Sequence, residues 1–230
     1  MKLFSKFIVA GGALLAVSVA PAQALVIGAP GDANTGNCYP FGCTGWGTEY
    51  QQVYASTDFS GPITITDIRF YHLNYSADAG TLNSGTFTFS LSTTSAPVNG
   101  LSSTLANNLG LDNTQVFSGT LPGTVAFGSF FDVFVSPFTY DPANGNLLLD
   151  ILSADANGGQ TFLDAHNGTF GDTSSRATNG PQCADDVCAS WGLVTGFNEN
   201  TAVPEPLTLS LFGAGFAGAA ALRRRKKIAA

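Results

Sequence analysis

Oxygen-bearing side chains in two short loops are the first residues whose types and spacing could bind an ion. Asp141, Asn144 and Asn146 stand at positions 1, 4 and 6 of one loop, and Asp155 and Asn157 precede a pair of glycines in another. Calcium takes roughly six to eight oxygen ligands and often draws them from such loops. The spacing is not that of an EF-hand, and an Asx-type turn between two strands explains the same residues. The pattern therefore favours turns, with calcium as the alternative and no other cofactor indicated.

An acid and a histidine, Asp164 and His166, are spaced so that they share one face if they lie on a strand. Nucleophilic hydrolysis would also need an activated Ser or Cys, and the chain has no Gly-x-Ser-x-Gly elbow. A glycan hydrolase needs two facing carboxylates, which the sequence alone cannot identify among so many acids. The pair therefore predicts a hydrogen-bonded group at a strand end, and no catalytic residue is assigned.

Four cysteines fall into two pairs with the same spacing, Cys38 with Cys43 and Cys183 with Cys188. In an oxidising compartment, disulfides are the expected state of such cysteines. Local pairing would close loops of about six residues and stabilise the fold by about 2 kcal/mol each, whereas cross-pairing would contribute about 5 kcal/mol each. Turn-forming residues inside both loops favour local pairs. Zinc is disfavoured, because no histidine is near and the repeated four-residue spacing is at the long end of zinc-ligand spacings.

Aromatic side chains form a third set with possible chemistry, because exposed Tyr and Trp rings can stack on sugars. The candidates are Tyr39, Phe41, Trp46, Tyr50, Tyr54, Phe70, Tyr71, Tyr75 and Trp191. Core packing explains the same residues. The set therefore leaves two interpretations open, with packing favoured over glycan contact.

Short runs of β-branched and aromatic residues must position all of these groups. Residues 25–49 are Gly-rich and predict an irregular segment. Strands are expected at 51–55, 63–71, 86–92, 115–119, 130–135, 147–152, 161–165 and 191–197, with alternation disturbed near Asp67 and a short helical turn within 101–109. No stretch of the body has a sustained helical period. The pattern predicts an all-β antiparallel sandwich or jelly roll.

Positive charge is concentrated at the two ends of the chain. Of nine Lys and Arg residues, only Arg69 and Arg176 lie in the body, which carries fifteen of the sixteen acids and a formal charge of about −13. Nucleic-acid binding is therefore excluded, because phosphate neutralisation needs clustered cations. Residues 1–24 have the charged start, apolar run and Ala22-Gln23-Ala24 site of a signal peptide, which predicts cleavage before Leu25 by signal peptidase.

The C-terminal segment, residues 203–230, has three parts in order. Two prolines in Val203-Pro204-Glu205-Pro206 predict an extended stretch, the uncharged run 207–222 predicts one short transmembrane helix, and Arg223, Arg224, Arg225, Lys226 and Lys227 form a basic stop. An ordinary single-pass anchor is the alternative interpretation.

These three parts resemble the PEP-CTERM sorting signal of Gram-negative bacteria. The resemblance implies recognition by a membrane-embedded exosortase, cleavage near the motif, and transient anchoring in the inner membrane before delivery to the cell surface or exopolysaccharide matrix. The body, expected at residues 25–202, resembles the central domain of many PEP-CTERM proteins at 50–54, 59–65 and 138–150. That family has no assigned catalytic activity.

The sequence thus predicts a non-catalytic exported surface or matrix protein. A polysaccharide-binding module, assisted by calcium, is the alternative, and a glycan hydrolase is the third hypothesis. Exopolysaccharide is the partner that the alternative would require.

Overall fold

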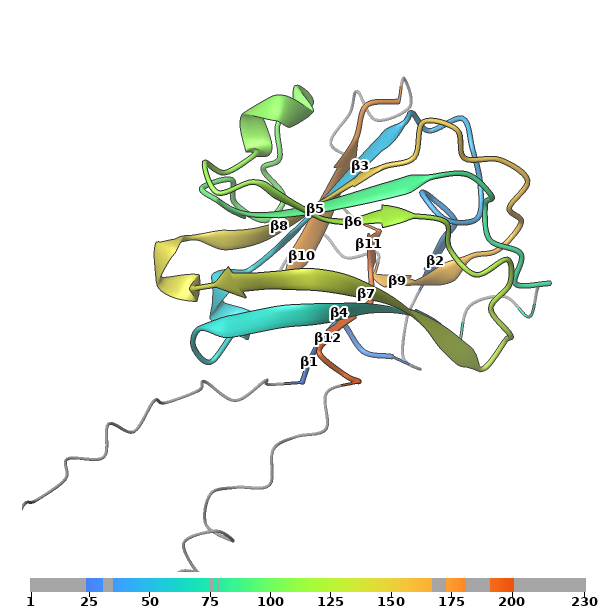
Figure 1. The fold of residues 1–230 in the computed structure, drawn as a ribbon, viewed down its shortest axis with the longest axis horizontal. Helices are drawn as coiled ribbons and strands as arrows, with labels where there is room; N and C mark the ends of the chain where they lie inside the picture. The colour runs from blue at the N-terminus through green and yellow to red at the C-terminus, as the bar shows by residue number, and fades with distance from the viewer. Residues whose placement is uncertain are drawn as a thin grey trace, which may run out of the picture.

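The architecture is all-β, as alternating short strands predict, and every paired strand is antiparallel (Figure 1). The computed structural model describes residues 24–30, 35–74, 77, 79–166, 173–180 and 191–200.

One face of the sandwich is a five-stranded sheet in the order β10-β3-β8-β5-β6. Its members are Ser174–Thr178 (β10), Glu49–Tyr54 (β3), Asn146–Leu152 (β8), Phe87–Thr94 (β5) and Thr114–Gly119 (β6). The alternation of apolar and polar residues is clearest in β5, where Phe87, Phe89 and Leu91 are fully buried on the core side.

The facing sheet has four strands in the order β1-β12-β4-β7. They are Leu25–Ile27 (β1), Thr195–Phe197 (β12), Ile63–His72 (β4) and Ser129–Tyr140 (β7). The register between β4 and β7 shifts between Ile65 and Asp67, so the predicted break in alternation is a β-bulge. β1 and β7 form the two edges of this sheet.

A smaller sheet, β11-β9-β2, is added to the two main sheets. It consists of Gly192–Leu193 (β11), Leu163–His166 (β9) and Thr35–Asn37 (β2). In the described part of the chain, three single-turn 3₁₀ helices lie in connections: Ser56–Asp58 (η1), Leu105–Asn108 (η2) and Pro142–Asn144 (η3). The second of these confirms the helical turn predicted within 101–109.

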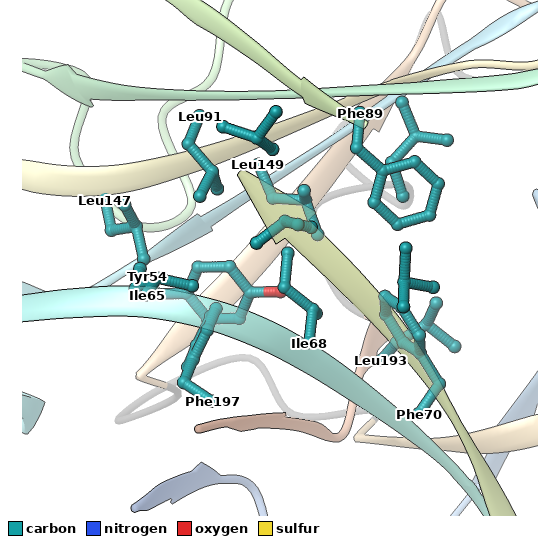
Figure 2. Close-up of a cluster of buried hydrophobic side chains, with 14 of the residues drawn as sticks. Tyr54, Ile65, Ile68, Phe70, Phe89, Leu91, Leu147, Leu149, Leu193 and Phe197 are labelled. Carbon is teal, nitrogen blue, oxygen red and sulfur yellow. The ribbon is translucent and has the colours of Figure 1, made fainter. Parts of the chain in front are cut away.

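Side chains from both main sheets meet in one apolar core (Figure 2). Leu91, Leu147 and Leu149 come from the five-stranded sheet, and Ile65 and Ile68 face them from β4. Polar contacts also cross the core. The Tyr54 hydroxyl on β3 donates to Thr195 Oγ1 on β12 at 2.9 Å, which satisfies a buried hydroxyl that would otherwise be costly. The predicted sandwich is therefore confirmed.

The Cys38–Cys43 disulfide closes the loop that carries Phe41, with the two Cα atoms 5.3 Å apart. Phe41 is fully buried, and its ring contacts those of Phe70 and Phe131 from the four-stranded sheet, and of two phenylalanines on β5. The predicted local pairing is confirmed for this disulfide. Its loop contributes a central residue of the core.

Two sequence predictions about strands are wrong, and one further strand was not predicted. Residues 25–49 contain β1 and β2, which are too short and Gly-rich to show a period. The strand expected at 191–197 is two strands in different sheets, because Val194 N–H donates to Asp164 O and the chain changes partner there. The strand β10 has a polar sequence, Ser-Ser-Arg-Ala-Thr, without apolar alternation, so its pattern gave no signal.

Candidate functional site

The last described residues before the sorting segment, Asn198–Asn200, are fastened to β4 and are called the tail root here. Asn198 adopts a positive φ of 57° that turns the chain after β12. Its side-chain oxygen accepts from Thr66 N at 2.8 Å, and its amide nitrogen donates to Thr64 O at 2.8 Å. Asn200 N donates to an oxygen of the Asp67 carboxyl at 3.3 Å. The bulge in β4 thus supplies backbone and side-chain partners for the residues that leave the sheet.

Four side chains form a charged group beside the tail root, called the Arg69 cluster: Arg69, Tyr71, Asp132 and Glu199. The guanidinium donates from Nε and Nη2 to the two Asp132 oxygens at 2.7 and 3.1 Å, a bidentate pair across β4 and β7. It also donates to Glu199 Oε2 at 3.0 Å. The Tyr71 hydroxyl donates to the same Glu199 oxygen. Such paired geometry both fixes orientation and strengthens each contact.

Electrostatics of the Arg69 cluster follow from this pairing. Burial disfavours the charged guanidinium, but the hydrogen bond and charge of Asp132, together with Glu199, outweigh it and raise the pKa of Arg69. Burial, and then the hydrogen bond to Glu199, raise the pKa of Tyr71. Burial also raises the pKa of Asp67, which lies next to the cluster. The pairing therefore favours the charged form of the Arg69 guanidinium.

A glycine leaves the space in which this cluster forms. Gly196 pairs with Arg69 in the register of β12 and β4. A Cβ at Gly196 would lie 2.7 Å from the Tyr71 hydroxyl and 3.1 Å from Glu199 Cγ and Cδ. The absence of a side chain there therefore lets Glu199 fold back over the sheet.

Two exposed phenylalanines lie on the same face as the Arg69 cluster. In the register of β4 and β7, Phe130 is opposite Tyr71 and Phe134 is opposite Asp67. The Arg69 guanidinium lies 3.5 Å from the Phe130 ring centroid, a cation–π contact. Phe130 is 42% exposed and Phe134 is 68% exposed. This edge of the sheet thus presents apolar surface next to the place where the sorting segment begins.

A second titratable group is the carboxyl pair of Glu49 on β3 and Asp150 on β8. Burial, followed by the charge of Asp150 and the hydrogen bond to it, raises the pKa of Glu49 to about 7. Burial raises the pKa of Asp150 as well. Gln51 Nε2 donates to oxygens of both acids, at 3.3 and 3.1 Å, and Asn108 Nδ2 donates to Gln51 Oε1 at 2.9 Å. Burial and the nearby acid therefore favour the protonated form of Glu49, within a network of amide hydrogen bonds beneath η2.

The geometry of this pair differs from that of glycan hydrolases. Those enzymes hold their two carboxyl groups about 5 Å apart or more, so that a sugar or water fits between them. Between Glu49 and Asp150, by contrast, the Gln51 amide nitrogen donates to an oxygen of each acid. The Gln51 side chain thus occupies the space between the two acids and links β3 to β8.

The five predicted calcium candidates lie in turns at opposite ends of β8. Asp141 accepts from Ala143 N at 3.0 Å as the N-cap of η3, and Asn146 accepts from Ser56 N at 2.9 Å. At the other end, Asp155 accepts from Thr86 N at 2.9 Å. Asn144 and Asn157 are exposed. A strand of seven residues, about 20 Å long, separates the two loops.

The two loops therefore do not share one ion, and the turn interpretation accounts for their bonded oxygens. Among the described residues, no group of three or more His, Cys, Asp or Glu side chains is arranged to hold a metal ion.

Histidines and their acid neighbour are held by backbone groups. The buried Asp164 carboxylate accepts from Leu73 N and Asn74 N at 3.2 and 3.1 Å. His166 Nε2 accepts from Ala29 N at 3.1 Å. His72 is fully buried, with Nδ1 3.2 Å from Val125 O. This agrees with the predicted hydrogen-bonded group at a strand end.

The aromatic candidates are mostly part of the core. Tyr39, Phe41, Tyr50, Tyr54, Phe70 and Tyr71 are buried, whereas Trp46 and Trp191 are half-buried. Tyr75 lies outside the described residues. The exposed aromatic side chains of the described part are instead Phe127, Phe130, Phe134 and Phe162. The six buried side chains therefore do not form an exposed platform on which sugars could stack.

Several predicted segments fall outside the described part of the chain: Ala22 of the cleavage site, Cys183 and Cys188, the motif 203–206, the apolar run 207–222 and the basic residues 223–227. Ala24 is described and exposed, directly before β1. Among the residues that the structure does cover, no helix is long and apolar enough to cross a membrane.

Comparison with protein families finds one match. Residues 202–226 match the model of the PEP-CTERM protein-sorting motif. No curated protein and no solved structure matches the chain. The chain therefore carries a PEP-CTERM sorting motif, as the sequence analysis expected. This motif implies an exported protein that an exosortase processes on its way to the cell surface.

The sequence analysis did not identify the tail root, the Arg69 cluster or the Glu49–Asp150 pair. One signal for the cluster was present, since Arg69 is one of only two cations in the body and a half-buried cation requires an acid partner. Which of the fifteen acids supplies it depends on strand register, which the sequence does not reveal.

Proposed function

We propose that this chain is a non-catalytic protein of the cell surface or extracellular matrix, delivered there by exosortase processing of its C-terminal segment. The observation that carries the proposal is the sorting motif at residues 202–226. It begins directly after a closed β-sandwich whose last described residue is Asn200.

The body supports a structural role in two ways. Its paired acids are used to join strands and to fasten the tail root, as the bonds of Asp132, Asp164 and Glu199 illustrate. Its composition, with about 13 more acids than cations, keeps an exported protein well solvated.

Signal peptidase would release the body at Leu25, and the exosortase would act near Pro204. The apolar run 207–222 would hold the chain in the inner membrane between these two events. The product would be a disulfide-closed sandwich without either terminal segment.

Intact mass of the protein from the parent host and from an exosortase-deletion host tests this proposal. The parent should yield a chain that begins at Leu25 and ends near the motif, in the surface or matrix fraction. The deletion host should yield a chain with an uncut tail in the inner membrane. An identical C-terminus in both hosts would contradict the sorting function, and a tail retained in both would indicate a plain anchor.

A further inference from the structure

The distance between the fastened tail root and the sorting motif is short. Only Thr201 and Ala202 separate Asn200 from Val203. A chain spans at most about 3.6 Å per residue, so the first motif residue lies within about 11 Å of Asn200 and Pro206 within about 22 Å. A protein of only 100 residues already has a radius of gyration of about 13 Å. A protease that grips the motif must therefore lie against the body.

The surface that such a protease meets is defined by the contacts of the tail root. Asn200 is bonded to Asp67, and Glu199 is bonded to Arg69 and Tyr71, all on the outer face of β4. The neighbouring strand β7 is an edge strand, which places Phe130 and Phe134 directly beside these residues.

The chemistry of this face suits a partner surface. Phe134, 68% exposed, is the most exposed aromatic ring of the described residues, and Phe130 is 42% exposed. Exposed aromatic side chains at the centre of a patch dominate binding energy in protein interfaces. Around them, one arginine is matched by Asp132 and Glu199, so the charged rim is acidic. The fitting partner has an apolar contact surface with cations at its border.

We infer that the outer face of β4 and β7, with Phe134 and Phe130 at its centre, is a docking surface for the protease that removes the C-terminal segment. This inference rests on the proposed sorting by an exosortase and adds where that enzyme contacts the body. The tail root presents the motif from a fixed point, and the two phenylalanines provide the contact energy. Recognition thus extends beyond the motif to the folded domain.

Pulse-chase labelling of the full chain in its host, followed by the mass of the C-terminus, measures the rate of tail removal. Phe134→Ser should slow removal about fivefold, and the double variant with Phe130→Ser should slow it further. Leu111→Ser is the matched control, since Leu111 is a fully exposed apolar residue in the loop before β6, and it should leave the rate unchanged. The melting temperature of each purified variant checks that the body is folded.

A second experiment changes the distance between the tail root and the sorting motif and leaves the β4–β7 surface unchanged. A Gly-Ser linker of about twelve residues inserted between Thr201 and Ala202 keeps the tail root fastened but lets the motif move away from the body. In that background Phe134→Ser should no longer affect the rate. A Phe134 effect of equal size with and without the linker would overturn the inference.

The outcomes separate the two proposals. Tail removal that depends on the exosortase but proceeds at the parental rate in the double phenylalanine variant overturns the docking surface alone. Tail removal that is unaffected by deletion of the exosortase overturns the sorting function and, with it, the docking surface.

Discussion

Replacing Glu49 by glutamine tests the raised pKa of Glu49 in the Glu49–Asp150 pair. The pKa of Glu49 is raised from 4.5 to about 7, chiefly by burial and then by the charge of Asp150. Because an acid with a raised pKa binds its proton more tightly in the folded state, its contribution to stability is complete below pH 4.5. That contribution is lost as the pH rises through about 7.

The size of the effect follows from the shift. At about 1.4 kcal/mol per unit of pKa, the full difference corresponds to about 3 kcal/mol. Glu49 keeps part of its surface in water, so solvent screening reduces this to about 1–2 kcal/mol. Glutamine resembles the protonated acid and carries no charge at any pH. Glu49→Gln should therefore be near neutral at pH 4.5 and stabilising by about 1–2 kcal/mol at pH 8.

Thermal unfolding of the mature protein and the variant between pH 4.5 and 8.5 provides the assay. The difference in melting temperature should grow from near zero to about 3–6 °C. Asp112→Asn, which removes one charge from an exposed loop acid, is the matched control for the general effect of lower net charge. A Glu49→Gln difference that is constant over this range, or equal to that of the control at each pH, would refute the raised pKa of Glu49.

Three further predictions concern the core and the turns. Phe41→Ala should lower the free energy of unfolding in urea by about 3–5 kcal/mol, because it empties a fully buried site between the sheets. Opening the disulfide with Cys38→Ser should lower it by only about 2 kcal/mol. Equal losses would contradict the view that the loop stabilises the fold mainly through its phenylalanine. Gly42→Ala should lower the melting temperature markedly, since its Cβ would lie 1.9 Å from Thr161 O, and Gly61→Ala, with nothing within 4 Å, should not. Asp141→Ala should lower the free energy of unfolding by about 1 kcal/mol through loss of the η3 cap, equally in chelator and in excess calcium. A loss of stability seen only with calcium would instead indicate ion binding.

Strands with strict alternation were predictable from the sequence, because a period of two directly reports which face is buried. β5 is the clearest case, and the irregularity at Asp67 was visible as a break in the same pattern. β10 was not predictable, since its polar residues are buried by neighbours that are remote in the chain. The candidate site likewise depends on residues that are remote in the chain.

The sorting motif is a local signal and could be read from consecutive residues. The Arg69 cluster joins residues of β4, β7 and the tail root, and the carboxyl pair joins β3 and β8. Both depend on which strands are neighbours and in which register. Register follows from long-range packing, which one sequence does not specify. The distinction between turn and calcium site also required knowing that β8 separates the two loops.

The pairing of β1 with β12 has a consequence for the order of events during export. Leu25 pairs with Phe197, so the first strand of the body has its partner at the other end of the domain. A chain that crosses the membrane from its N-terminus delivers β1 first and β12 almost last. Until then β4 lacks its neighbour on that side, and the sheet is incomplete. The four-stranded sheet can therefore be completed only when the segment next to the sorting motif has emerged.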